Sequence, residues 1–365
     1  MFILYCRCWI DIQKERTNVF WQINMRICFF RHSLLSRGGD KMVVEHANYL
    51  VSQGHDVTIV TNVLDTVFEV KARIHRISRL HNRAITILKA LSFAKPCDVI
   101  IADIVMMVFF LSFKNRKRLV CFAQDYDESY YKGTPMKLLI RAAYFYCLRV
   151  LRLPAISVSE ALGQLLARRF KADVHVVANG VDTGVFYPDP EYMSLKDGRP
   201  VVLVFGRSDY RKGFDLAIRV LGRFKAEIDS GTLAVWSVGE ELSTPFKMRR
   251  FGFVTPDRLR KILSASDVLL YPSRHEGLPL FVLEALACGC PIVTTEAVSI
   301  LTNALDGVVC PVEGVECLAK GLRSVLNDRK FQSGLIVRGL ATAKKYTLSN
   351  CKRLFEECIL ALFEK

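Results

Sequence analysis

Hydrophobic and polar positions alternate along this chain in a regular rhythm that begins at Met25. Short apolar runs of strand length are followed by a polar turn and then by a longer segment with apolar residues at helical spacing. The first runs read RICFF, DVTIVT, DVIIAD, RLVCFA and AISVS, and the helix-length segment KMVVEHANYLVSQ follows the first of them. This order predicts βαβ units arranged around a parallel sheet.

A second series of the same kind begins at Arg199, with strand runs PVVLVFG, TLAVWSVG, SDVLLYPS and PIVTT. A chain of 365 residues exceeds the size of one hydrophobic core. The fold class is therefore predicted as α/β, with two Rossmann-like domains and an interdomain cleft. Turn formers in Ala178–Asp182 mark the boundary. The predicted parts are residues 25–180, residues 181–345, and a helix in 346–365 that packs back toward the first domain.

Residues 1–24 carry no element pattern, and we expect them to be an appendage or a mis-assigned start. Their apolar beginning is broken by Arg7 and lacks a small-residue cleavage site, which does not fit a signal peptide or a membrane span. The longest apolar run, Ile104–Phe113, has about half the length that a bilayer requires, so it predicts a buried helix. A cytoplasmic protein is expected.

The formal net charge of +15 favours partners that are anionic: nucleic acid, lipid headgroups or phosphorylated small molecules. No CxxC pairing, RNP-like aromatic signature or helix-turn-helix spacing accompanies the charge, so nucleic acid is not expected. The twelve cysteines are scattered through apolar segments, which is typical of buried reduced thiols in a cytosolic protein. Examples are Cys28, Cys97, Cys121, Cys147 and Cys310.

The segment Pro272–Pro291, PSRHEGLPLFVLEALACGCP, is the most specific in the chain. A strand ends in a polar loop, Pro279 suits a first helical turn, and Gly289 suits the position after the helix. A helix N-terminus beyond a parallel strand is a phosphate-binding position. Within the following helix, Glu284 is surrounded by apolar residues, where two ribose hydroxyls would satisfy its carboxylate. The alternative is that Glu284 is exposed or pairs with a nearby cation.

A second constellation, VFGRSDYRKGFDLAI, places Arg207 directly after a strand and Lys212 where a helix is about to begin. A planar guanidinium and an ammonium together match a diphosphate. Solvated surface cations are the alternative. Two further segments are weaker: paired glycines at Gly38 and Gly39 permit close backbone approach to a ligand, and Asp125-Tyr126-Asp127 has the spacing of a metal-binding D-x-D, which we reject as a required metal site.

The run from Glu276 to Pro291 resembles the E-x7-E segment of family 4 retaining glycosyltransferases, also described as glycosyl transferases group 1, which have the GT-B fold. By that resemblance Glu276 lies beside the transferred sugar, the loop at Gly277 and Leu278 contacts the sugar and the diphosphate, and Glu284 binds the nucleotide ribose. The similarity covers nearly all of residues 25–365.

Three other segments resemble the same family. Gly206, Arg207 and Lys212 resemble its GR…KG motif, whose cations hold the donor diphosphate. Gly39 resembles its N-terminal GG loop, which faces donor and acceptor. Asn179 and Gly180 resemble its P-N-G-V-D crossing, here with Ala178 in place of Pro, and are expected to form a hinge.

The chain departs from the family where many members carry a histidine near the sugar. It reads Gln124-Asp125 there, so either residue replaces the histidine, and Asp125 joins Glu276, Arg207 and Lys212 as a candidate catalytic residue. The resemblance implies transfer with retention, with no cofactor or required metal, because cations stabilise the departing diphosphate. Rival functions are a nucleotide-sugar epimerase or phosphorylase of the same fold, or a non-catalytic basic protein that binds lipid or nucleic acid.

The expected partners are a nucleotide-sugar donor and a saccharide or lipid-linked acceptor in surface polysaccharide or glycoconjugate assembly. Residues 132–152 contain cations interleaved with apolar residues and no acid, which suits an anionic membrane surface. These cations are Lys132, Lys137, Arg141, Arg149 and Arg152. A buried amphipathic helix with a solvated basic edge is the alternative. Peripheral association with the cytoplasmic face of a membrane is therefore expected.

Overall fold

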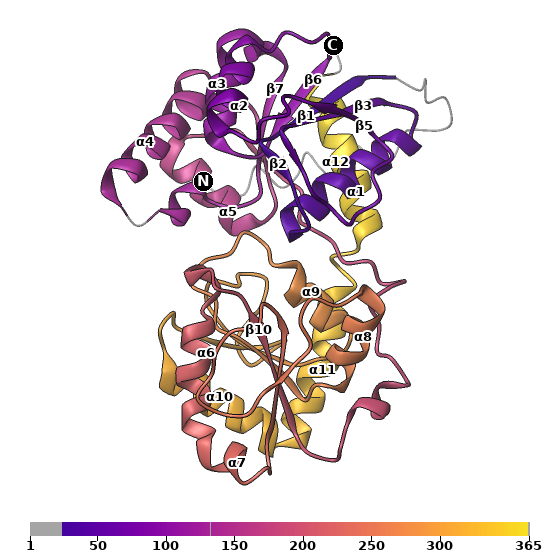
Figure 1. Ribbon diagram of the computed structural model, residues 1–365, viewed down its shortest axis with the longest axis vertical. Coiled ribbons are helices and arrows are strands. Elements are labelled where there is room, and N and C mark those ends of the chain that lie inside the picture. The colour runs from indigo at the N-terminus through magenta and orange to yellow at the C-terminus, as the bar shows by residue number, and fades with distance from the viewer. Residues whose placement is uncertain (1–23, 132, 364–365) are drawn as a thin grey trace, which may run out of the picture.

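The computed structural model describes residues 24–131 and 133–363, in which two α/β domains lie end to end (Figure 1). The predicted fold class is confirmed. The segment expected to be an appendage lies, except for its last residue, outside the described residues, as does Lys132.

Within the described residues, the N-terminal domain is built on a seven-stranded sheet in the order β5-β3-β1-β6-β7-β8-β9, and every neighbouring pair is parallel. The strands are β1 (Arg26–Phe30), β3 (Asp56–Thr61), β5 (Arg73–Arg76), β6 (Val99–Ala102), β7 (Leu119–Ala123), β8 (Ala155–Ser157) and β9 (Val174–Val176). A small side sheet pairs β2 (Ser33–Leu34) with β4 (Val63–Leu64).

The helices of this domain are α1 (Gly38–Ser52), α2 (Arg83–Ser92), α3 (Val105–Asn115), α4 (Thr134–Tyr144) and α5 (Glu160–Phe170). The 3₁₀ turns η2 (Arg116–Arg118) and η3 (Asp127–Tyr130) flank β7, and α4 continues into the π-helical turn η4 (Phe145–Val150). The run predicted as a buried helix is α3 in part: Val108 and Leu111 are buried, whereas Phe113 is exposed. Among the described helices, none has the length and apolar character needed to span a membrane.

The C-terminal domain repeats the arrangement with a six-stranded parallel sheet, counted within the described part of the chain, in the order β12-β11-β10-β13-β14-β15. Its strands are β10 (Val201–Gly206), β11 (Ala234–Gly239), β12 (Arg249–Arg250), β13 (Val268–Tyr271), β14 (Ile292–Thr295) and β15 (Val308–Cys310). Its helices are α6 (Phe214–Leu221), α7 (Lys225–Asp229), α8 (Pro256–Ala265), α9 (Leu280–Ala287), α10 (Val315–Asn327) and α11 (Arg329–Ala343), with 3₁₀ turns η5 (Tyr192–Leu195), η6 (Tyr210–Lys212) and η7 (Gly222–Phe224).

Strand order reverses at the same place in both sheets, between β1 and β6 and between β10 and β13. Loops that leave neighbouring strands in opposite directions open a crevice at the carboxyl ends of those strands, where open α/β sheets bind ligands. The residues that follow β1, β7, β10 and β13 are therefore placed at the functional edge of each domain.

Within residues 24–131 and 133–363, the chain crosses between the domains twice. Val181 pairs with Thr347 in a parallel bridge, so the two crossing segments run side by side. A Cβ on Gly180 would overlap the carbonyl oxygen of Thr347, which makes glycine a requirement of this close contact. The second crossing leads into α12 (Leu348–Phe363), which lies against α1 in the N-terminal domain (Figure 1).

One cysteine expectation is wrong. Cys310 forms a disulfide with Cys317, and is not a reduced thiol. The turn between β15 and α10 brings their Cα atoms to 5.8 Å, a separation that suits a disulfide. The four other cysteines named as buried thiols are free and buried.

Candidate active site

The E-x7-E segment begins where β13 ends. All four residues of β13 are buried, and the loop after Tyr271 runs to Pro279, which occupies the N-cap of α9. Gly289 follows the helix with φ of 73°, a left-handed conformation that glycine adopts without steric strain. These local rules place Glu276 in the loop and Glu284 in the second turn of α9.

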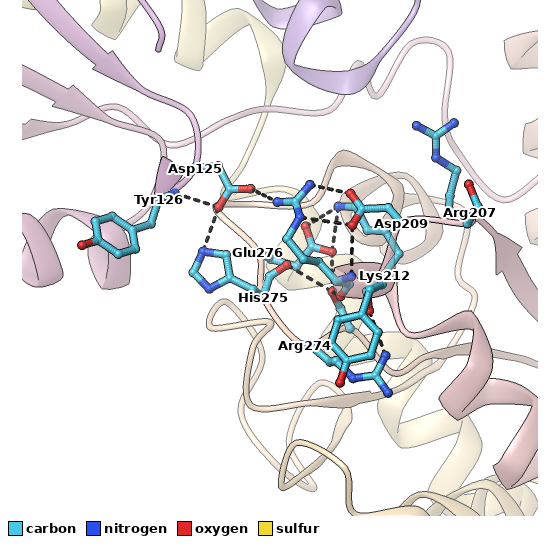
Figure 2. A network of polar contacts seen from close by, with 12 residues as sticks. Asp125, Tyr126, Arg207, Asp209, Lys212, Arg274, His275 and Glu276 are labelled. Carbon is cyan, nitrogen blue, oxygen red and sulfur yellow. Dashed lines mark hydrogen bonds and ion pairs between the residues drawn. The ribbon is translucent and has the colours of Figure 1, made fainter. Parts of the chain in front are cut away.

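Glu276 lies at the centre of a polar cluster (Figure 2). Its carboxylate accepts hydrogen bonds from Lys212 Nζ at 2.7 and 2.9 Å, from the Tyr271 hydroxyl at 2.8 Å and from Ser273 Oγ at 2.7 Å. Its side chain is only 4% exposed, so these donors compensate a carboxylate that burial would otherwise disfavour. Burial, and secondarily the charge of Glu276, raise the pKa of Tyr271 well above its usual value.

Lys212 reaches Glu276 because the loop after β10 packs closely against the loop after β13. Gly213 has φ of 67°, and a Cβ there would overlap the Pro272 carbonyl oxygen. The Arg211 carbonyl accepts a hydrogen bond from Arg274 N at 2.7 Å, and Ser273 Oγ lies 2.8 Å from the same oxygen. The loop after β10 and the loop after β13 therefore form one unit that carries both Lys212 and Glu276.

Arg207 lies apart from this pair (Figure 2). Its guanidinium is 3.2 Å from Glu240 Oε1, and Glu240 also accepts a hydrogen bond from Ser208 N at 2.8 Å. A Cβ on Gly206 would overlap the carbonyl oxygen of Glu240. Of the two predicted diphosphate cations, one is paired with Glu276 and the other with Glu240, so a bound diphosphate would share or replace these partners.

Glu284 has a cationic partner from the other domain. Lys41 Nζ, on α1, lies 3.2 Å from Glu284 Oε1 and 5.5 Å from the centre of the Phe186 ring. The glutamate side chain is 11% exposed. The sequence alternative of a pairing cation is thus realised, and the ribose role of Glu284 stays a prediction.

The N-terminal domain contributes Gly39, Gln124 and Asp125. A Cβ on Gly39 would lie 2.9 Å from Gln124 Oε1, and a Cβ on Gly277 would overlap the Gln124 carbonyl oxygen. Both predicted glycine positions thus permit close packing against Gln124, one within the domain and one across the interface.

Asp125 contacts the C-terminal domain directly. Its Oδ2 accepts a hydrogen bond from Arg211 Nη1 at 2.5 Å, and its Oδ1 lies 2.8 Å from His275 Nε2. Burial works against the ionised form, but the close approach of His275 and the charge of Arg211 leave the pKa of Asp125 below its usual value.

Asp127 differs from Asp125. Its Oδ2 accepts the backbone N–H of Val105 at 2.6 Å, and burial raises its pKa to about 7. The two carboxylates of the D-x-D sequence therefore have separate partners. Among the residues that the structure describes, no group of three His, Cys, Asp or Glu side chains is placed to hold a metal ion.

The predicted hinge is tied to the site loop. Asn179 Nδ2 donates a hydrogen bond to the Leu278 carbonyl oxygen at 3.1 Å. A movement at the crossing would therefore displace the loop that contains Gly277 and Leu278.

Sequence reasoning missed five residues that the structure brings to the site. They are Lys41, Arg211, Tyr271, Ser273 and His275. Arg211 and His275 immediately precede the predicted Lys212 and Glu276, which was the available indication. Lys41 follows the Gly-Gly-Asp turn, but no local pattern links it to a residue more than two hundred positions away.

Two parallel-sheet domains with facing carboxyl edges and polar loops define the GT-B class of fold. Two family models match the chain: "Glycosyltransferase Family 4" over residues 36–185 and "Glycosyl transferases group 1" over residues 199–328. The chain belongs to the family 4, group 1 glycosyltransferases.

Curated relatives match in part. The chain is 24% identical to an uncharacterized glycosyltransferase of Methanocaldococcus jannaschii over 206 residues, 50% of this chain and 53% of that protein. It is 30% identical to O-antigen chain mannosyltransferase B of Escherichia coli over 118 residues, 32% of this chain and 31% of that protein. The chain thus spans about half the length, or less, of these relatives.

Solved structures match over nearly their whole length. Sucrose-phosphate synthase from Thermosynechococcus elongatus has a TM-score of 0.79 at 16% identity, covering 93% of this chain and 100% of that chain. Anabaena HepE, solved with UDP and glucose, has a TM-score of 0.75 at 16% identity, covering 92% and 99%. At such identities the likeness shows the fold.

Proposed function

We propose that this protein is a retaining glycosyltransferase that moves a sugar from a nucleotide diphosphate-sugar to a saccharide or lipid-linked acceptor. The single observation that carries the proposal is the partly buried contact of Lys212 with Glu276, made by adjacent loops at the carboxyl ends of β10 and β13. Family membership supports it, as do relatives named for the assembly of O-antigen and lipopolysaccharide core.

The proposed chemistry depends on stabilising the diphosphate as it leaves. Lys212 and Arg207 supply positive charge at fixed positions, so no metal ion is required for that task. Glu276, held by three side-chain donors, orients the hydroxyls of the transferred sugar. The leaving phosphate assists removal of the acceptor proton on the same face, which retains the anomeric configuration.

Glu284 is proposed to bind the nucleotide ribose. In the structure its Oε1 is within 3.2 Å of Lys41 Nζ, so ribose hydroxyls would share the carboxylate with Lys41 or displace it. A carboxylate that accepts two hydroxyl hydrogen bonds retains lone pairs for a third donor, so sharing is compatible with the chemistry.

The acceptor is proposed to lie at an anionic membrane on the cytoplasmic side. The surface formed by α4 and η4, here called the α4 face, exposes Met136, Leu138, Leu139, Phe145 and Val150 beside Lys137, Arg141, Arg149 and Arg152. A hollow of about 380 Å³ adjoins it, lined by Leu138, Arg141, Ala142, Phe145, Arg169 and Phe170. Apolar side chains that insert between headgroups, with cations around them, suit an anionic bilayer surface.

A nucleotide screen tests the proposal. The full chain is melted with UDP, GDP, ADP or dTDP, since a ligand that binds only the native state raises the melting temperature. At least one nucleotide should raise it, and the matching nucleotide-sugar should release that nucleotide in the presence of EDTA as its sugar passes to an added saccharide or, more slowly, to water. Glu316→Gln is the matched control, because Glu316 pairs with Arg223 on an exposed surface of the same domain. No response to any nucleotide, or loss of activity in EDTA, would contradict the proposal.

A further inference from the structure

Asp125 is the point at which the N-terminal domain holds the two site loops of its partner domain. It follows β7, and each of its carboxylate oxygens contacts a different side chain of the C-terminal domain. Arg211 contacts Oδ2. His275 contacts Oδ1 (Figure 2). Since Tyr126 N also donates to Oδ1 at 2.8 Å, the carboxylate is held by its own backbone in a fixed orientation.

The two partners of Asp125 are the sequence neighbours of the candidate reactive residues. Arg211 precedes Lys212, and His275 precedes Glu276. A contact that fixes one residue of a loop also restricts the backbone from which the next side chain projects. The pairing with Asp125 therefore restrains Lys212 and Glu276 without touching either of them.

Arg211 is surrounded by groups from both domains. Asp209 accepts hydrogen bonds from Arg211 at 2.6 and 3.2 Å, and the Tyr130 ring of the N-terminal domain lies 3.6 Å from the guanidinium carbon. Arg211 is 11% exposed and Asp125 is 14% exposed, so water screens this contact less than it would a surface ion pair. Opening the domains would leave Asp209 with Arg211 but would separate Asp125 from both Arg211 and His275.

We propose that Asp125 is a positioning residue, which pairs with Arg211 and His275 to align Lys212 and Glu276 against the N-terminal domain when the domains close. The proposal rests on the proposed function and differs from a role of Asp125 in contact with the sugar. It predicts that removal of the pairing opens the domains and lowers turnover, whereas the nucleotide, held by the C-terminal domain, binds as before.

The test measures domain separation independently of activity. Small-angle X-ray scattering on the full chain, alone and with UDP or GDP, compares the parent with Asp125→Asn, His275→Gln and Arg211→Gln. Each variant should give a larger radius of gyration. Turnover should fall on the order of a hundredfold, as expected for reacting groups misplaced by about 1 Å. Nucleotide affinity should change less than about twofold, and Asp125→Glu should restore part of the turnover.

Two controls make the outcome decisive. Asp98→Asn breaks an exposed ion pair with Arg26 in the same domain, and it should leave scattering and turnover unchanged. The double variant Asp125→Asn with His275→Gln should be no worse than Asp125→Asn alone, because both changes remove the same contact. Lower turnover with unchanged scattering would overturn the proposal in favour of direct substrate contact. Failure of the parent to bind nucleotide would instead count against the proposed function.

Discussion

Lys212 and Glu276 neutralise one another in a site proposed to receive a negatively charged diphosphate leaving group. Removing one member of a buried pair leaves the other uncompensated, but Glu276 retains hydroxyl donors from Tyr271 and Ser273. Lys212, 21% exposed, retains access to water. Lys212 is thus able to exchange Glu276 for a phosphate oxygen. Both residues would still have hydrogen-bond partners after the exchange.

Lys212→Ala and Arg207→Ala should each reduce transfer by about a hundredfold or more, because a lost contact to a developing charge is worth roughly 2.7–4 kcal/mol. The melting temperature should stay close to that of the parent, since neither side chain packs in a core. The two effects should combine less than additively, as both cations serve one leaving group. Steady-state kinetics of the single and double variants check this, and parental turnover in the double variant would contradict it.

Glu284→Gln should weaken nucleotide binding about tenfold to a hundredfold, because hydrogen bonds to a charged group contribute roughly 1.5–3 kcal/mol. Lys41→Met provides the matched change on the other side of the same contact. It should not weaken binding, since it frees the carboxylate for ribose. Calorimetric titration with the nucleotide identified by melting measures both variants. Parental affinity in Glu284→Gln would show that this residue serves only as the partner of Lys41.

At the scale of elements, α12 completes the N-terminal domain through aromatic packing. The Phe355 ring stacks on His46 of α1 with centroids 3.9 Å apart and lies 5.2 Å from the Phe122 ring of β7. His46 is buried, and this burial, with a smaller contribution from the charge of Lys352, lowers its pKa to about 3. The imidazole is therefore neutral in the folded protein throughout the physiological range.

Acidification should destabilise this packing. The unfolded chain protonates His46 near its ordinary pKa of about 6.5, whereas the folded protein does not until about pH 3. Stability from this residue is complete above pH 6.5 and falls as pH decreases toward 3, by about 2 kcal/mol at pH 5 at 1.36 kcal/mol per pH unit. Urea unfolding of the parent and of His46→Gln at pH 7 and pH 5 isolates the term. An equal loss in both proteins would contradict it.

The α4 face is expected to bind anionic vesicles, a second prediction at the scale of elements. Leu138→Ser with Leu139→Ser should reduce flotation with anionic vesicles, because two exposed leucines lose their insertion. Binding of the parent should weaken with added salt, since screening reduces attraction between exposed charges. Val337→Ser, on exposed α11 in the other domain, is the control and should float like the parent. Equal flotation with neutral vesicles would argue against an anionic surface.

At the scale of the whole molecule, local sequence patterns predicted the elements of each domain but not the contacts between the domains. The order of apolar runs and helix-length segments predicted the strands β1, β10 and β13. A buried strand leaves an apolar run in the local sequence, so it can be read without knowledge of the rest of the fold. The loop positions of Glu276 and Lys212 followed from the pattern around them and from the family resemblance, but their contact with each other did not. The Lys41–Glu284 and Asp125–His275 contacts did not follow, because each joins distant segments whose meeting depends on how the domains dock. The Cys310–Cys317 bond did not follow either, because cysteines scattered through apolar segments do not indicate which two of them meet in the fold.

The crossing at Gly180 determines how the two domains are joined, and it makes the last prediction. A Cβ on Gly180 would overlap the backbone of Thr347 and the Cα of Leu348. These are backbone atoms, which cannot move aside as the end of a flexible side chain can. Gly180→Ala should therefore lower the free energy of unfolding by roughly 1–3 kcal/mol, the usual penalty for overpacking. Because Val181 and Thr347 would be forced apart, the backbone amides at the start of α12 should also exchange hydrogen faster.

Gly222→Ala is the matched control, since Gly222 has φ of −58° and nothing within 4 Å of the added carbon. It should be neutral or slightly stabilising, because alanine restricts the unfolded chain. Denaturant unfolding with exchange measured at α12 distinguishes the two. If both variants matched the parent, the crossing segments would have room to separate, and the close contact would not constrain the domains.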